Sequence, residues 1–341
     1  MNIILDDTNV KQKLYPFSAT RHVADIRIGI LTIRQKWDLL DANNFIYEEE
    51  RTVLIPANII PTITNVHAIF TACVTGNLVD ANKEIKYLHH PWNIFELNDW
   101  ALRKDFELIT AGRKSQPISA TNKIIGLQNI FIEEGAIVEH SIINASTGPV
   151  YIGKNATIME GCIIRGPFAL CDNATLKMGT KIYGTTTVGP NCVAGGEIKN
   201  TVFFANSNKA HDGYLGDSVI GEWCNLGAGT TNSNIKNTAG PVKVWDQAQN
   251  KFVIVGLKCG LLMGDYSRSA INTSFNTGTV VGVCCNVFGE GFQPKLLPNF
   301  TWGKQKYILD KALQDIDNWK KLKGENISLA EQEFLKELYN H

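Results

Sequence analysis

No stretch of this 341-residue sequence stays apolar over the length that a membrane-spanning helix needs. The N-terminus, MNIILDDTNV, has a short apolar run that two aspartates interrupt, so it does not read as a signal peptide. Basic and acidic residues each number 33, which leaves no net charge to favour nucleic acid or an anionic membrane as a partner. We therefore expect a cytoplasmic protein that binds neither nucleic acid nor membrane.

Motifs for several catalytic classes are also absent. None of the eight cysteines forms a CxxC pair, and most stand at small or apolar repeat positions, which predicts buried free thiols rather than disulfides. Histidine and cysteine do not cluster at zinc-ligand spacings, so we expect no metal site of that kind. No GxSxG is present, which argues against a hydrolase with a nucleophile elbow.

What the sequence does contain is a six-residue repeat. From Ile152 an aliphatic residue leads seven consecutive hexads: Ile152, Ile158, Ile164, Leu170, Leu176, Ile182 and Val188. The rhythm resumes with Ile220 and Leu226, and we expect it again with Ile271, Thr277 and Val283. A period of six fits neither the 3.6 of a helix nor the 2 of an open sheet.

Such a period fits a β-solenoid with flat walls, in which three hexads close one triangular coil and each leading aliphatic residue points to the axis. Parallel stacking of the coils then satisfies the backbone hydrogen bonds. The pattern resembles the left-handed parallel β-helix of the hexapeptide acyltransferases. The fold class predicted is an α/β N-terminal domain followed by an all-β left-handed parallel β-helix and C-terminal helices.

The flanks lack the repeat, and we place domain boundaries at 1–105, 106–302 and 303–341. The first domain mixes strand-like runs (NIIL, TVLIP, AIFTACV) with helical patterns at DIRIGILTIRQKWDLL and WNIFELNDWALRKDFELI. The last segment holds two amphipathic stretches, and Ser328 with Glu331 fits a capping box that opens the final helix. Because a solenoid end leaves unpaired strand edges, we expect these helices to cap, brace or join subunits.

Residues 209–234, KAHDGYLGDSVIGEWCNLGAGTTNSN, interrupt the hexads with a histidine, an aromatic residue and several asparagines. This stretch resembles the acetyltransferase domain of the bifunctional N-acetylglucosamine-1-phosphate uridylyltransferase/glucosamine-1-phosphate acetyltransferase family. The spacing of His211 and Tyr214 matches that family, and Asn225 and Asn234 lie nine residues apart as it requires. One residue is missing between Ala210 and His211, which makes the loop tighter. The resemblance covers roughly residues 125–290.

The resemblance implies transfer of an acetyl group from acetyl-CoA to an amine. His211 is the candidate general base, because imidazole can take a proton near neutral pH; a structural hydrogen bond is the alternative role. Backbone N–H groups at Ala228 and Gly229 could polarise the thioester carbonyl. Asn225 and Asn234 are candidates for orienting the base or binding sugar hydroxyls, and the Tyr214 hydroxyl is a candidate for binding the phosphate or the sugar.

Two lysines are further candidates from the same resemblance. Family alignment places Lys199, and more loosely Lys181, where the sugar phosphate binds. A solvated solenoid corner explains Lys181 equally well.

The front domain resembles a shortened sugar-1-phosphate nucleotidyltransferase. Its LYPFSAT segment is similar to the LxPLT part of that family's loop, with Lys13 where an arginine would stand, but the phosphate-binding glycines are absent. Lys13, Arg21 and Arg27 are the candidate phosphate-binding residues. Mg²⁺ would be needed only if nucleotidyl transfer is retained, and Asp6 and Asp7, being adjacent on a strand, would point to opposite faces.

The function predicted is an acetyl-CoA-dependent N-acetyltransferase that acts on an amino-sugar phosphate in nucleotide-sugar synthesis. Nucleotidyl transfer or sugar-nucleotide binding by the front domain is one alternative, and a non-catalytic scaffold is another. We expect a homotrimer, because one flat wall offers only a shallow groove and coenzyme A needs a cleft between two walls. The segment KNTAGPVKVWDQAQNKF, residues 236–252, is expected to line that cleft.

Overall fold

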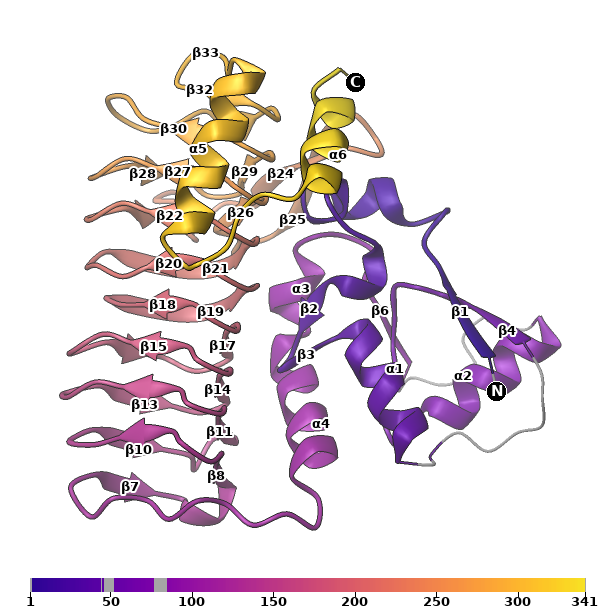
Figure 1. The fold of residues 1–341 in the computed structure, drawn as a ribbon, viewed down its shortest axis with the longest axis vertical. Helices are drawn as coiled ribbons and strands as arrows, with labels where there is room; N and C mark the ends of the chain where they lie inside the picture. The colour runs from indigo at the N-terminus through magenta and orange to yellow at the C-terminus, as the bar shows by residue number, and fades with distance from the viewer. Residues whose placement is uncertain (1, 44, 46–51, 77–84, 341) are drawn as a thin grey trace.

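The structure, a computed structural model, describes residues 2–43, 45, 52–76 and 85–340. A small α/β unit comes first, a long parallel β-helix follows, and two helices close the chain (Figure 1). Among the helices in these ranges, none combines the length and hydropathy that crossing a bilayer requires. The left-handed β-helix with flanking α/β and helical segments confirms the predicted fold class.

The β-helix has three walls, each a stack of parallel strands. The open wall carries β7 (Lys123–Ile125), β10 (Ile142–Asn144), β13 (Ile163–Arg165), β16 (Lys181–Ile182), β23 (Thr231–Asn232), β28 (Ser274–Phe275) and the first halves of β19 (Glu197–Phe203) and β21 (Tyr214–Ile220). The covered wall carries β8 (Ile130–Ile132), β11 (Val150–Ile152), β14 (Phe168–Leu170), β17 (Thr186–Val188), the second halves of β19 and β21, β26 (Leu261–Met263), β29 (Thr279–Val281) and β31 (Leu296–Leu297).

The third wall, which we call the helix wall, carries β9 (Ile137–Val138), β12 (Thr157–Ile158), β15 (Thr175–Leu176), β18 (Val193–Ala194), β20 (Asn208–Lys209), β22 (Asn225–Leu226), β27 (Arg268–Ser269), β30 (Asn286–Val287), β32 (Thr301–Trp302) and the antiparallel β33 (Gln305–Lys306). Strands β19 and β21 run across two walls because Asn200 and Asp217 turn the corner at positive φ.

The seven predicted hexad leaders all point into the solenoid. Ile152 through Val188 at six-residue spacing belong to one buried cluster inside the walls, which confirms this part of the prediction. Coil length is not constant, however. Ile152 pairs with Leu170 after 18 residues, whereas Thr187 pairs with Val202 after 15 and Val202 with Val219 after 17. The hexads therefore lose their spacing between Val188 and Ile220 although strand stacking continues.

The predicted register after the second excursion is wrong. Ile271 is 70% exposed, and Val283 packs against the C-terminal helices instead of the solenoid interior. The inward positions are Met263, Ser269, Phe275, Val281 and Val287. The physical reason is the antiparallel hairpin of β24 (Val242–Asp246) and β25 (Lys251–Gly256), whose insertion shifts the count of hexads by an amount that the sequence spacing does not reveal.

The N-terminal unit pairs β1 (Asn2–Asp6) with β4 (Thr52–Pro56) in parallel, and β2 (Arg27–Ile28) with β3 (Leu31–Thr32) and β5 (Ile59–Ile60) with β6 (Lys86–Tyr87) antiparallel. Short 3₁₀ turns span 11–14, 17–19 and 23–25. Helices α1 (Ile33–Ala42), α2 (Val66–Thr75), α3 (Asn93–Glu96) and α4 (Asn98–Thr110) complete the unit.

Two local predictions in this unit are wrong. The helix expected over 25–40 begins only at Ile33, because Gly29 at positive φ turns β2 into β3 and Thr32 with Gln35 forms the capping box. The run AIFTACV is part of α2, whose buried residues Val66, Ile69 and Phe70 follow helical spacing and which ends at the left-handed Gly76. Apolar runs of this length do not distinguish strand from helix.

The N-terminal unit packs on the covered wall, as Figure 1 shows for α3 and α4. One buried cluster joins Phe17, Trp37 and Phe95 of the unit to Val219 and Leu262 of the wall. Asn98 at the start of α4 donates to the carbonyl of Thr185, and Thr187 donates to the carbonyl of Gly29. These long-range contacts fix the unit against the β-helix.

Helix α5 (Leu309–Lys321) lies on the helix wall and α6 (Leu329–Asn340) near the N-terminal unit (Figure 1). The predicted capping box is confirmed: the Glu331 N–H donates to Ser328 Oγ at 3.2 Å, and the Ser328 N–H donates to Glu331 Oε2 at 2.8 Å. Trp223 on the helix wall lies under the Lys320 ammonium, 5.0 Å from it. The helices thus brace the upper coils.

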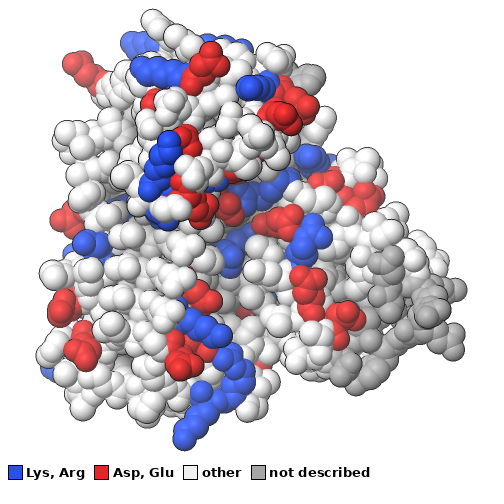
Figure 2. Space-filling model, in the orientation of Figure 1, with Lys and Arg blue, Asp and Glu red and all other residues white. Residues whose placement is uncertain are grey.

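The distribution of charged side chains and the state of the cysteines are those expected from the composition. Figure 2 shows acidic and basic side chains interspersed on the visible face, in keeping with the equal totals. All eight cysteines are free, and seven of them are buried, Cys73 being half-buried. The thiols of the solenoid serve as small core side chains, and burial raises the pKa of Cys171 to about 11.

Candidate functional site

His211 lies in a corner of the β-helix, between β20 on the helix wall and β21 on the open wall. Its side chain is exposed and has no hydrogen-bond partner among the described residues. The coil that carries it is one residue shorter than a regular coil, in agreement with the shortened sequence before His211. The imidazole is therefore held by its backbone alone and is free to meet a substrate.

Lys209 fixes that backbone from inside. It occupies an inward position of the helix wall, paired with Ala194, and is 1% exposed. Its ammonium donates to the carbonyls of Gly195 at 3.0 Å and His211 at 2.7 Å. Burial lowers the pKa of Lys209 to about 8, with nearby Asp212 opposing the shift. Sequence reasoning missed this residue because the shortened coils hide which positions point inward.

The corner of the next coil stacks directly against the His211 corner. It contains Ala228 and Gly229, and the Gly229 N–H donates to the Asp212 carbonyl at 3.1 Å. The Ala228 N–H has no acceptor among the described residues. Of the two predicted oxyanion donors, the structure therefore leaves one, at Ala228, available. Gly229 has a positive φ, and a Cβ there would lie 2.2 Å from Asn272 Oδ1, so a larger residue would be strained and would displace the Asn272 side chain.

Tyr214 and Asn234 meet on the open wall. Asn234 Nδ2 donates to the Tyr214 hydroxyl at 3.0 Å and to Asp217 Oδ2 at 2.5 Å, and Asn200 Nδ2 donates to Asp217 Oδ1 at 2.6 Å. The ring crosses Gly216, where a Cβ would lie 2.1 Å from the hydroxyl. Burial, with Asp217 and Glu197, raises the pKa of Tyr214 to about 12, so the hydroxyl stays protonated and can donate to a ligand.

The two predicted lysines lie on the same wall, below Tyr214. Lys181 pairs in register with Glu197, which pairs with Tyr214, while Lys199 pairs with Gly216. Both lysine side chains are exposed, and none of the described carboxylates lies within ion-pair distance of them. The open wall therefore presents two unpaired cations beside the tyrosine.

Asn225 lies apart from this group. It is on the helix wall, in register with Asn208 and Arg268. Lys323, just after α5, donates to Asn208 Oδ1 at 3.2 Å. The structure thus divides the predicted residues between two walls that meet at the His211 corner, with Asn225 on one wall and Tyr214, Asn234, Lys181 and Lys199 on the other.

A pocket of about 610 Å³ lies above Asn234, between the open wall and the β24–β25 hairpin. Three lysines line it: Lys236, Lys243 and Lys295. Burial lowers the pKa of Lys295, and the other two ammonium groups add to the effect. Five residues of the segment 236–252 line this pocket, namely Lys236, Asn237, Thr238, Lys243 and Phe252, and none of the predicted site residues does. The contribution of Lys295 was not foreseen, because it lies 52 residues from the Lys243 whose carbonyl it contacts.

The three candidate cations of the N-terminal unit are not brought together. Arg21 is partly buried and pairs with Asp265 and, at 2.8 Å, with Glu222. Lys13 is exposed on the first 3₁₀ turn, and Arg27 is buried in β2. Arg21 therefore joins the unit to the solenoid, and the other two face different surroundings.

Asp6 and Asp7 are both engaged locally. Asp6 accepts from Thr8, and Asp7 accepts from the Val23 N–H at 3.2 Å and lies 3.6 Å from His22 Nε2. Among the described histidines, cysteines and acids, no cluster of three is arranged to hold a metal ion.

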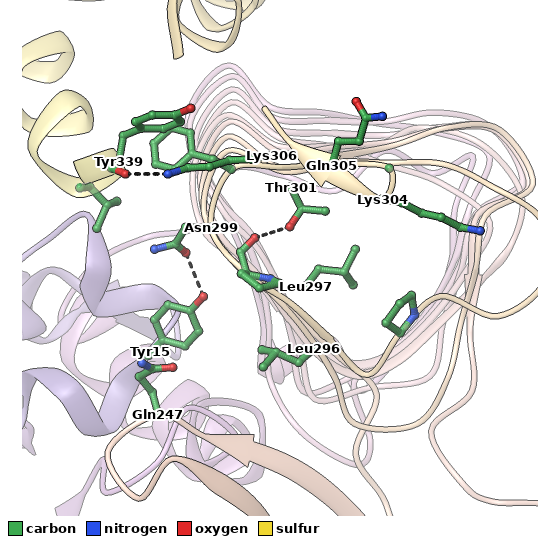
Figure 3. Close-up of a pocket in the computed structure, with 15 residues that line it drawn as sticks. Tyr15, Gln247, Leu296, Leu297, Asn299, Thr301, Lys304, Gln305, Lys306 and Tyr339 are labelled. Carbon is green, nitrogen blue, oxygen red and sulfur yellow. Dashed lines mark hydrogen bonds between the residues drawn. The ribbon is translucent and has the colours of Figure 1, made fainter. Parts of the chain in front are cut away.

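Another pocket, of about 790 Å³, lies at the last coil (Figure 3). Two of its polar side chains have partners within the lining: the Tyr15 hydroxyl donates to Asn299 Oδ1 at 2.9 Å, and Lys306 donates to the backbone carbonyl of Tyr339 at 3.2 Å. None of the predicted site residues lines it. Here the N-terminal unit and α6 meet the end of the solenoid.

Comparison with known proteins agrees with the resemblance seen in the sequence. Residues 2–48 match the family model described as sugar nucleotidyl transferase. The chain is 32% identical over 195 residues to the bifunctional protein GlmU of Methanocaldococcus jannaschii, a match that covers 57% of this chain and 41% of that protein. It is 30% identical over 199 residues to a bifunctional sugar-1-phosphate nucleotidylyltransferase/acetyltransferase of Sulfurisphaera tokodaii, covering 58% and 43%.

The chain thus spans less than half the length of these relatives. A solved structure from Bacillus cereus, described as an acetyltransferase, aligns at 12% identity with a TM-score of 0.19, covering 64% of this chain and 90% of that one.

Proposed function

We propose that the protein is an acetyl-CoA-dependent N-acetyltransferase that acts on an amino-sugar phosphate. The observation that carries this proposal is the edge of the open wall, where a free imidazole at His211 stands beside the corner with the free Ala228 N–H. The relative from Sulfurisphaera tokodaii, a bifunctional sugar-1-phosphate nucleotidylyltransferase/acetyltransferase by name, supports the same chemistry.

His211 is the proposed general base. The substrate amine forms a bond from nitrogen to the thioester carbonyl carbon, and His211 takes the proton that the nitrogen loses. The carbon–sulfur bond then breaks, and the thiolate leaves with a proton that the imidazolium can return. A backbone N–H at Ala228 is the donor available for the oxygen on which negative charge develops. Lys209 acts through the backbone and positions the imidazole.

The open wall is the proposed binding surface for the sugar phosphate. Lys199 and Lys181 supply positive charge for the phosphate, and the protonated Tyr214 hydroxyl and the Asn234 amide supply hydrogen bonds for sugar hydroxyls. Asn225 reaches the same ligand from the helix wall. The lysine pocket at Lys236, Lys243 and Lys295 suits the phosphates of coenzyme A, because three ammonium groups line one concave surface.

A homotrimer completes this site in the proposal. Four outward side chains of the lower open wall are apolar or aromatic yet exposed, Ile125, Ile142, Ile163 and Tyr183, and they share this wall with the exposed cations Lys123, Arg165 and Lys181. A flat face of this mixed kind is suited to contact a neighbouring solenoid around a closed three-fold axis. Sedimentation should give the mass of a trimer at micromolar concentration, and a monomer would contradict the proposal.

Sharing of the site between subunits has its own test. Mixing a His211→Ala variant with a Lys243→Ala variant and allowing exchange should restore part of the activity, since some clefts would contain both native residues. Absence of recovery, with exchange proven by tagged subunits, would confine the site to one chain.

Nucleotidyl transfer by the N-terminal unit is the second candidate, favoured by the family match over residues 2–48. That activity would require Mg²⁺ and a phosphate-binding loop. Asp6 and Asp7 are engaged by Thr8, Val23 and His22, and the loop glycines are missing. The residues present do not fit a metal-dependent site, so we derive no step through one. A non-catalytic scaffold remains the third candidate.

One experiment separates the three. Thiol release from acetyl-CoA is measured with glucosamine 1-phosphate, glucosamine 6-phosphate and unphosphorylated glucosamine, in parallel with pyrophosphate release from UTP and a sugar 1-phosphate. We expect thiol release that depends on the phosphorylated amino sugar, and no pyrophosphate. Pyrophosphate release alone would favour the second candidate, and neither product would favour a scaffold.

A further inference from the structure

A second pocket, of about 520 Å³, lies between the N-terminal unit and the covered wall. Its lining comes from the β2–β3 turn, α1, the end of α4 and three successive coils of the β-helix, and includes Arg27, Gln35, Leu39, Leu108, Tyr151 and Asp172. It lies on a different wall from His211. Its size is within the range that holds small organic molecules in proteins.

Arg27 is the buried charged group at this pocket. The residue is 7% exposed, and among the described residues its side chain makes one hydrogen bond, from Nη1 to the Ile30 carbonyl. Among the described residues no carboxylate lies within 4.0 Å of the guanidinium, whereas the partly buried Arg21 pairs with two. A buried charge that lacks a counter-ion is costly, so its retention beside a cavity points to an anionic ligand.

The buried neighbours do not supply the missing charge. Asp105 is the nearby carboxylate, and it pairs with the buried Lys36. The same carboxylate accepts from the Ile30 N–H at 2.7 Å and from the Leu31 N–H at 3.1 Å. The charges of Lys36 and Asp105 cancel each other. The three buried residues Lys36, Asp105 and Arg27 together therefore carry one excess positive charge, that of Arg27.

The charged side chains at the rim of the pocket either form a neutral ion pair or are acidic. Arg113 binds Glu133 through two hydrogen bonds, of 2.8 and 2.6 Å, and the Tyr151 hydroxyl donates to the same carboxylate at 2.9 Å. Asp172 is exposed and accepts from the Lys154 N–H at 2.9 Å. A ligand with two negative charges would meet Asp172 at the entrance and only one unpaired cation inside.

We propose that this pocket binds a small organic carboxylate, with the carboxylate on Arg27 and an apolar body against Leu39, Leu108 and Tyr151. A planar guanidinium matches a carboxylate through parallel hydrogen bonds, and one excess positive charge matches one negative charge. The site is separate from the proposed acetyl-transfer site, and a ligand bound there would tie the N-terminal unit to the solenoid.

Three probes with the same ring and different charge test the proposal: phenylacetate, phenylacetamide and phenyl phosphate. Ligand-observed NMR titration of the full chain should show saturable binding of phenylacetate, at least about tenfold weaker binding of the neutral amide, and no gain for the phosphate. Equal affinity for phenylacetate and phenylacetamide would overturn the proposal, as would tighter binding of phenyl phosphate.

Variants assign the binding to this pocket. Arg27→Gln should remove the preference for phenylacetate over the amide, whereas the control Arg34→Gln, at an exposed arginine of α1 paired with Asp25, should keep it. If Arg27→Gln does not fold, Ala111→Trp offers a second test, because Ala111 is an exposed residue of the lining that a bulky side chain can fill. Unchanged phenylacetate binding in Ala111→Trp would overturn the proposal, and acetyl transfer is not a readout in either test.

Discussion

The open wall and the covered wall both direct stacked side chains into the solenoid core. They differ in the surroundings of the side chains that point outward. On the covered wall the middle residue of each three-residue stretch points outward and is buried under the N-terminal unit: Phe131, Tyr151, Ala169, Thr187, Val202, Val219, Leu262 and Val280. On the lower open wall the outward residue is the first of each strand and stays exposed, for example Ile142 at 40% and Ile163 at 51%. The inward residues therefore make the solenoid, and the outward residues decide what each wall does.

Polar groups differ between the walls in the same way. On the covered wall they are engaged by the N-terminal unit, as in the hydrogen bonds of Asn98 with Thr185 and of Thr187 with Gly29. At the edge of the open wall the His211 imidazole and the Ala228 N–H have no partner among the described residues. A binding surface requires groups of the second kind, because a group that is already satisfied gains little from a ligand.

The largest expected effect concerns packing, namely how much the outward side chains of each wall contribute to stability. Leu262→Ala removes a fully buried outward side chain of the covered wall and should lower the free energy of unfolding by about 2–5 kcal/mol. Ile163→Ala on the open wall should change the free energy of unfolding of a single subunit by at most about 0.5 kcal/mol. Denaturant unfolding at low protein concentration measures both. A similar loss of unfolding free energy in the two variants would mean that the outward side chains of the two walls are equally buried.

The second prediction concerns the edge of the open wall. His211→Ala should lower the rate of acetyl transfer by roughly 10² or more, because a general base contributes about this much, and should leave the melting temperature unchanged. His140→Ala is the matched control, since His140 is also an exposed histidine at a solenoid corner. Turnover like that of the unmodified protein in the His211 variant would remove this residue from the mechanism.

The third prediction separates positioning from binding. Lys209→Met keeps the length of the side chain but removes the hydrogen bonds to Gly195 and His211. We expect kcat to fall roughly 10- to 100-fold with little change in KM, because the imidazole loses its alignment and the sugar site stays intact. An equal rise in KM would indicate that the whole edge has collapsed.

Lys209 also predicts a pH dependence of stability. Its pKa is about 8 in the folded chain and about 10.5 in an unfolded one, so between these values the unfolded state binds more protons. The Lys209 contribution should therefore raise the free energy of unfolding as pH increases from about 8 to 10.5. The unfolding free energy of the unmodified chain minus that of Lys209→Met should grow over this window, and a constant or falling difference would contradict the lowered pKa.

The smallest expected effect is that of Lys199. Lys199→Ala should raise KM severalfold for a phosphorylated amino sugar and leave KM for the unphosphorylated sugar unchanged, since an exposed lysine contributes on the order of 1 kcal/mol to holding a phosphate. Lys123→Ala, an exposed lysine far down the same wall, is the control. Equal changes for both sugars would assign Lys199 to structure.

Sequence reasoning worked where the signal was local and repeated. The hexads from Ile152 to Val188 were all placed inward, and the capping box at Ser328 and Glu331 was identified from two residues. It failed at AIFTACV, which is helical in α2, and at Ile271, which points to solvent. In both places an apolar residue fits more than one structure, and only distant contacts select between them.

The sequence by itself determined the β-helix, because an aliphatic residue at every sixth position can be buried only if the chain coils with that period. It also determined which short stretch carries the candidate chemistry, through the spacing of His211, Tyr214, Asn225 and Asn234. Tertiary structure alone decided which wall is covered and that Lys209 points inward beneath His211. It alone paired Arg21 with Asp265, 244 residues away, and left Arg27 without a described counter-ion. The reason is that outward side chains contact segments that are remote in the sequence, and the local spacing of residues does not predict such contacts.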